Sequence, residues 1–174
     1  MIRSATLFCL LACSAAGLAA GPAALLDEAA GITIHGTEYG PVTLSEGVWE
    51  GEPWVEGGAS RPRVGLARDF LRRGDVDGDG QDELLVVVWQ SSGGSGTFNY
   101  IALLDENDGT LRNTSTAALG DRVKVLEGAV SPGLVEVEVL EHDEDDAACC
   151  PTRHAVRRFD ADLQPLDTPD GKPE

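Results

Sequence analysis

Short runs of apolar and β-branched residues, separated by Gly, Pro, Asp and Asn, are the feature that most constrains the fold of this chain. Such runs are typical of strands joined by tight turns, and no long segment has the period of an amphipathic helix. We therefore predict a mainly β fold with little helix, built on a twisted antiparallel sheet, with an α+β fold as the alternative. The predicted strands are residues 32–35, 41–50, 63–66, 83–90, 97–105, 111–117, 122–127, 134–141 and 154–160.

Two of these segments indicate how their strands face the core. Residues 84–89 are apolar throughout, which predicts a central strand buried on both faces. Val135, Val137 and Val139 alternate with glutamates, and this period of two predicts a strand with one face on the core and the other in water. One helical turn is expected near residues 25–30.

The balance of charge limits the partners of the chain. Lys and Arg number 13 while Asp and Glu number 30, which gives a formal net charge of −17. Such a chain repels nucleic acid and anionic membrane surfaces, so we exclude nucleic acid as a partner. Cations are the natural partners, although solubility alone also explains an acidic surface.

The N-terminal residues 1–20 have the features of a secretory signal. Arg3 precedes an apolar run that is too short to span a bilayer as a permanent helix. The run ends in the sequence LLAC, at Cys13, and resembles the bacterial lipoprotein box, in which the cysteine is acylated. This resemblance implies that Cys13 attaches the protein to a membrane through a lipid, and cleavage after Ala19 is the alternative. Both interpretations predict an extracytoplasmic protein, in the periplasm or at the cell surface.

A single domain fits the length of the chain. Its 174 residues can bury one proper core after removal of the signal, but they are too few for two ordinary domains. Composition sets the boundaries, because segments rich in Ala and Gly, or in Pro, Asp, Gly and Lys, are typical of flexible chain. The expected segments are a flexible tether at 14–24, one β-rich domain at 25–165 and a disordered tail at 166–174.

Residues 74–83 place carboxylates at alternate positions, an arrangement that lets one short loop surround a hard cation. Gly78 and Gly80 allow the chain to curl around such an ion. We predict a structural Ca²⁺ site, and a solvated Asp/Gly turn is the alternative. The predicted ligands are the side chains of Asp75, Asp77 and Asp79, the backbone carbonyl of Gln81 and the carboxylate of Glu83.

This loop differs from an EF-hand. The twelfth position of the loop is Val86 instead of an acidic residue, and a β run follows where an EF-hand has a helix. Residues 74–88 instead resemble the calcium loops of FG-GAP and VCBS-type β proteins. Those loops recur on propeller blades, whereas this chain carries one copy, so we exclude a full propeller.

Further segments carry a second resemblance. They are EGVWEGEPWVEGGASRP at 46–62, GGSGTFNY at 93–100, LGDRV at 119–123 and CCPT at 149–152. Together with the calcium loop they resemble a family of small bacterial extracytoplasmic lipoproteins, over roughly residues 25–159. The resemblance implies a single domain at the cell envelope, and it implies no reaction.

The cysteines and histidines near the C-terminus form a second candidate site. Cys149 and Cys150 lie between His142 and His154, and imidazole with thiolate suits copper or zinc. A transition-metal-handling or redox module is therefore an alternative function. Adjacent cysteines splay their side chains, however, and no second pair completes a zinc module. In an oxidising exterior we expect Cys149 and Cys150 to form a vicinal disulfide.

No motif in the sequence indicates catalysis. None of the three histidines lies in a recognisable nucleophile motif, and we assign no catalytic residue. Trp49 and Trp54, which lie among glutamates, can line a ligand surface or pack in the core. We expect an envelope protein with a binding or structural role, whose partner is another envelope protein or a glycan. A hydrolase is the second alternative.

Overall fold

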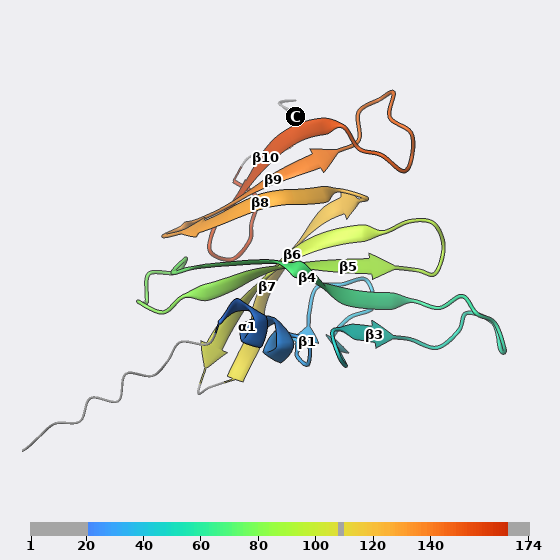
Figure 1. Ribbon diagram of the computed structural model, residues 1–174, viewed down its shortest axis with the longest axis horizontal. Coiled ribbons are helices and arrows are strands. Elements are labelled where there is room, and N and C mark those ends of the chain that lie inside the picture. The colour runs from blue at the N-terminus through green and yellow to red at the C-terminus, as the bar shows by residue number, and fades with distance from the viewer. Residues whose placement is uncertain (1–20, 108–109, 167–174) are drawn as a thin grey trace, which may run out of the picture.

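The computed structural model describes residues 21–107 and 110–166 (Figure 1). The chain is mainly β, with 52% strand and one short helix, and this confirms the predicted fold class. The described elements are α1 (Pro22–Ala29), β1 (Thr33–Ile34), β2 (Val42–Thr43), β3 (Val48–Glu50), β4 (Arg63–Gly74), β5 (Glu83–Ser91), β6 (Phe98–Asn107), β7 (Thr110–Asp121), β8 (Lys124–Ser131), β9 (Leu134–Glu141) and β10 (Arg153–Phe159).

The strands pair antiparallel in three sheets. The largest has the order β3-β4-β5-β6-β7 and curls into a half-barrel. A second sheet has the order β10-β9-β8, and β1 pairs with β2 in a small third sheet. Figure 1 shows the β8–β10 sheet on one side of the half-barrel, and α1 with β1 on the other. The half-barrel is therefore a middle layer with a covering on each face.

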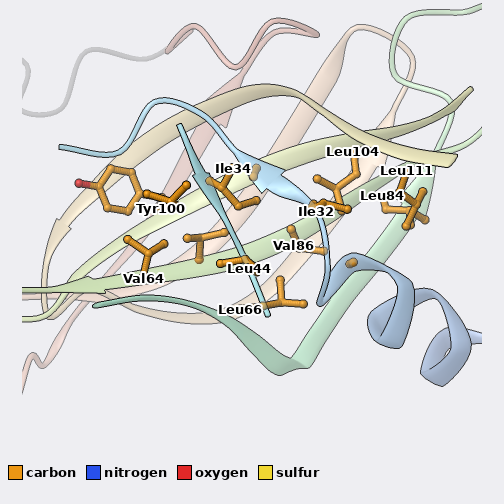
Figure 2. Packing of buried hydrophobic residues seen from close by; sticks show 14 of the residues in the cluster. Ile32, Ile34, Leu44, Val64, Leu66, Leu84, Val86, Tyr100, Leu104 and Leu111 are labelled. Carbon is orange, nitrogen blue, oxygen red and sulfur yellow. The ribbon is translucent and has the colours of Figure 1, made fainter. Parts of the chain in front are cut away.

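Strand β5 occupies the centre of the half-barrel. It contributes side chains to two hydrophobic cores, one on each face of the half-barrel. Leu84, Val86 and Val88 belong to the cluster under α1, β1 and β2. Figure 2 labels Leu84 and Val86 in this cluster, with Ile34 and Leu44. Leu85 and Val87, which alternate with them along β5, belong to the cluster on the opposite face, with the three valines of β9. The prediction of a strand buried on both faces is confirmed for 84–88, while Trp89 is half-buried. Complete burial of one Val or Leu side chain contributes about 1.5–3 kcal/mol.

Strand β9 follows its predicted pattern. Its bounds, Leu134–Glu141, agree with the sequence prediction, and the three alternating valines are fully buried. Pro22 lies in the first turn of α1, where a missing backbone N–H costs nothing. Leu25 and Ala29, four residues apart, form the buried stripe of that helix.

Apart from 134–141, the predicted strands differ from the observed ones by one to four residues at their ends, and two strands differ more. The prediction of one strand at 41–50 is wrong, because a tight turn separates β2 from β3. Glu46 and Gly47 both have positive φ there, and Ser45 and Val48 exchange backbone hydrogen bonds. The strand predicted at 63–66 continues to Gly74, and a shift of register between Leu66 and Leu71 interrupts its pairing with β5.

The ends of the described chain differ in detail from the predicted segments. Helix α1 begins at Pro22, so the last residues of the range predicted as a tether are helical. Leu166, the first residue of the predicted tail, donates its backbone N–H to the Arg158 carbonyl oxygen. The predicted signal with Cys13, and residues 167–174 of the tail, lie outside the described residues. Within the described ranges, no helix has the length and hydropathy that crossing a bilayer requires.

Leu85→Ala tests the core between β5 and the β8–β10 sheet. Leu85 is fully buried at the centre of β5, so its truncation should leave a cavity and lower the free energy of unfolding by about 2–5 kcal/mol. Urea unfolding measures this loss. Leu166→Ala is the matched control, because Leu166 is 54% exposed and should change stability little. Equal unfolding midpoints for the two variants would contradict the burial of Leu85 in this core.

Candidate metal site

The loop that joins β4 to β5 is organised by its own aspartates. The Asp75 carboxylate accepts hydrogen bonds from Gly78 N at 2.7 Å and from Gly80 N at 3.0 Å. Gly78 and Gly80 have φ of 84° and 91°, a backbone conformation that other residues adopt only with strain. Aspartate side chains that bond backbone N–H groups a few residues on are typical of tight turns. The alternation of Asp and Gly therefore specifies the curl.

Three carboxylates converge inside this curl. One oxygen from each of Asp75, Asp77 and Glu83 lies within 4.8 Å of the other two. Two oxygens bound to one calcium-sized cation, at about 2.3–2.6 Å each, can be at most about 4.6–5.2 Å apart. The group can therefore hold a metal ion. It is the one such acidic or His/Cys group in residues 21–107 and 110–166.

Glu83 is the buried member of the group. It is the first residue of β5 and is 5% exposed, and its Oε2 accepts a hydrogen bond from Val76 N at 2.7 Å. Burial raises the pKa of Glu83, and the charges of Asp77 and Asp79 add to the rise, against the lowering effect of the Val76 hydrogen bond. No Lys, Arg or His in the described ranges forms an ion pair with Glu83. A bound cation would relieve this repulsion.

The other predicted ligands lie beside this group. The Asp79 carboxylate accepts hydrogen bonds from Gln81 N at 2.7 Å and from Gln81 Nε2 at 3.3 Å. The Asp79 carboxylate does not belong to the converging group. The roles of Asp79 and of the Gln81 carbonyl as ligands stay predictions. Asp82 forms an ion pair with Arg73 at 3.4 Å, away from the group.

The second candidate site does not converge in the described part of the chain. Cys149 and Cys150 form a disulfide and are exposed, in the loop between β9 and β10. Asp146 organises this loop, because its carboxylate accepts hydrogen bonds from the backbone of Asp143 and from Thr152, and these bonds lower the pKa of Asp146. His142, Cys149, Cys150 and His154 do not form a metal-holding group there.

Of the two tryptophans predicted to line a surface or the core, Trp49 lies at the core and Trp54 at the surface. Trp49 packs against the core under α1, and the Tyr39 ring lies 5.7 Å from it and 6.5 Å from the Trp54 ring. Trp54 is 58% exposed. Sequence analysis missed a different aromatic residue, Trp89, which lines a surface hollow with three charged side chains. An isolated glycine in a strand, here Gly65, is the signal that could have indicated the close approach of this ring.

Comparisons with protein-family models, with curated proteins and with solved structures find no match for this chain. The resemblances to extracytoplasmic lipoproteins and to FG-GAP and VCBS-type loops stay predictions. The chemistry of the site rests on the geometry of its own residues.

Glu83→Gln tests the buried charge in metal-free protein. Because the folded-state pKa of Glu83 is raised, the folded protein keeps a proton that the unfolded chain releases between the ordinary and the raised pKa. The free energy of unfolding in chelator should therefore fall as pH rises through that window. Glutamine keeps the Val76 hydrogen bond without the charge, so the variant should lose this fall and be more stable at neutral pH.

Urea unfolding across a pH series measures the effect. Glu127→Gln is the control, because Glu127 is exposed and Arg72 lowers its pKa by a side-chain hydrogen bond. This control should leave the fall in place. A metal-free Glu83→Gln protein that is less stable than the wild type at neutral pH would contradict the interpretation.

Proposed function

We propose that this chain is an exported, lipid-anchored envelope domain whose β4–β5 loop binds a structural calcium ion. One observation carries the proposal, namely the convergence of the buried Glu83 carboxylate with Asp75 and Asp77. Burial of an anion among other anions is costly unless a cation compensates for it. The loop therefore has an arrangement that a bound cation would stabilise.

The donor set favours calcium over other metals. All three converging groups are carboxylates, and zinc and copper prefer sites that include nitrogen or sulfur. Magnesium requires near-ideal octahedral geometry and gives up water reluctantly. Calcium accepts six to eight oxygens in flexible geometry. Asp79, the Gln81 carbonyl and water would complete its coordination in this proposal.

The contacts of the loop support a structural role for the ion. Val76, within the loop, is buried in the core between the two larger sheets. Its carbonyl oxygen accepts a hydrogen bond from Gly133 N, in the turn between β8 and β9, at 2.8 Å. A Cβ at Gly74 would lie 2.4 Å from the Val130 carbonyl oxygen, so β8 and the end of β4 are in close contact. An ion that holds the loop would therefore hold the β8–β10 sheet against the half-barrel.

The proposed location suits such a site. The secretory signal and the lipoprotein-type Cys13 would place the domain outside the cytoplasm. Extracellular calcium modules function with dissociation constants of about 10⁻⁴ to 10⁻³ M. A ligand that binds only the folded state stabilises it even at such modest affinity. In this role the domain is a calcium-stabilised binding or structural module, with an envelope protein or a glycan as partner.

Asp77→Ala tests the calcium site. Calcium at a hundred times its dissociation constant should raise the free energy of unfolding of the wild type by about 2.7 kcal/mol, with a matching rise in Tm. Removal of the Asp77 carboxylate should abolish this rise. Thermal unfolding of residues 21–174 in calcium, in chelator and in magnesium measures the effect.

Asp82→Ala is the matched control for this experiment. Asp82 lies in the same loop and carries the same charge, but it pairs with Arg73 outside the converging group. It should keep the calcium-dependent rise. The calcium proposal is wrong if the wild type shows no rise, or if Asp77→Ala shows the same rise as Asp82→Ala.

Cys13→Ser tests the lipid anchor. Serine cannot accept the thioether-linked lipid, so the variant should lose radiolabelled palmitate and leave the membrane fraction of a bacterial host. Cys9→Ser is the control, because Cys9 lies inside the predicted signal and would be removed with it. Labelling of Cys13→Ser at the wild-type level would overturn the anchor assignment.

A further inference from the structure

A hollow of about 600 Å³ lies on the half-barrel at the end opposite to the metal loop. Its walls include Glu50, Arg61, Arg63 and Trp89, together with glycines of the β5–β6 loop. Register explains how Glu50, Arg63 and Trp89 meet. Glu50 pairs with Arg63, and Gly65, two residues further along β4, pairs with Trp89. Residues that pair directly or lie two apart share one face of a sheet. All four belong to one end of the half-barrel, where β3, β4 and β5 lie side by side.

Trp89 supplies an aromatic surface to the hollow. A Cβ at position 65 would lie 2.2 Å from Trp89 Cζ2 and 2.7 Å from Nε1, so the edge of the indole occupies the space above Gly65. The side chain is half-buried and lines the hollow. Within the described ranges, no acceptor binds the indole N–H. The ring therefore offers both an apolar surface and a hydrogen-bond donor.

The charge of the hollow is opposite in sign to that of the whole chain. Arg61 NH1 lies 2.9 Å from Glu50 Oε1, and Arg63 Nε lies 3.1 Å from Glu50 Oε2. Two guanidinium groups thus share one carboxylate and leave one positive charge, in a chain whose formal net charge is −17. The terminal nitrogens of Arg63 bind no other group in the described part of the chain, and the side chain is 50% exposed. They are available to an anion.

Hydrogen bonds between two loops hold the shape of the hollow. Ser60 Oγ donates to the Gly93 carbonyl oxygen at 3.1 Å, and Trp54 Nε1 donates to the Ser92 carbonyl oxygen at 2.6 Å. Gly93 has a φ of 84°, and a Cβ there would lie 2.5 Å from Ser60 Oγ. The loop after β5 is therefore fitted against the loop before β4. A preformed wall lowers the entropy that a ligand must overcome.

We propose that this hollow binds an acidic sugar, a pyranose ring that carries a carboxylate. The sugar carboxylate accepts two parallel hydrogen bonds from the Arg63 guanidinium, which suits planar carboxylates. The C–H face of the sugar ring packs against the indole of Trp89. An isolated inorganic anion would use the arginines but leave the aromatic surface in water. A neutral sugar would use the ring but leave the positive charge unpaired.

Indole N–H signals in NMR test the proposal directly. The chain has three tryptophans, and Trp89→Phe identifies the signal of Trp89. Cellobiouronic acid, which is glucuronic acid linked to glucose, should shift this signal saturably in the full-length domain at constant calcium. Cellobiose differs by having a hydroxymethyl group in place of the carboxylate. It should bind at least about tenfold more weakly, since it lacks a charge-assisted hydrogen bond.

Arg63→Gln should weaken cellobiouronic acid binding by about tenfold or more, because it removes the charge that pairs with the carboxylate. Arg68→Gln is the matched control and should bind as the wild type does. Arg68 also lies on β4 and is 49% exposed, but it pairs with Asp27 of α1. Circular dichroism and Tm verify that both variants fold.

Three results would overturn the proposal. The first is equal binding of cellobiose and cellobiouronic acid, and the second is equal binding by Arg63→Gln and Arg68→Gln. The third is a saturable shift of the Trp89 signal with acetate or inorganic phosphate at the same concentrations, which would show a simple anion site. Failure of the calcium experiment would leave these results unaffected, because the hollow and the metal loop lie at opposite ends of β5.

Discussion

Burial of β5 on both faces is the constraint on which the rest of the structure depends. One strand can belong to two cores only if its side chains alternate between two covering layers, here α1 with β1 and β2 on one face, and β8–β10 on the other. Both covering layers bury their apolar residues in clusters that include residues of β5. Their packing against β5 therefore fixes the position of everything attached to that strand.

Because packing fixes the position of β5, the side chains at its two ends are also held in place. At its first residue, the strand leaves Glu83 only 5% exposed, with its carboxylate close to those of two aspartates. Near its last residues, the strand places Trp89 against Gly65 and beside a pair of arginines. A flexible loop could let charged groups relax into water, whereas groups at the ends of a buried strand keep their separation. This is the physical reason why both candidate sites lie where regular structure meets a loop.

Local patterns in the sequence predicted the features that depend on local geometry. The apolar run at 84–88 and the alternation at 135–139 follow from the pleat of a strand, and the Asp75 and Glu83 spacing follows from the length of the loop. The continuation of β4 through Arg68 and Asp69 could not be predicted, because a bulge turns these polar residues outward. The hollow could not be predicted either. It depends on the register of three strands, which no single segment specifies.

The field of the acidic chain acts differently on the ligands of the two candidate sites. The acidic loop agrees in sign with the whole chain, whose field attracts cations and raises their local concentration. An anion that approaches the hollow moves against the same field, so long-range attraction cannot bring it there. Salt at physiological strength screens exposed charges beyond about 8 Å, while contacts with Arg63 act at hydrogen-bond distance. In the proposed site, recognition of an acidic sugar therefore comes from contact with Arg63 and Trp89 together, because long-range attraction contributes nothing.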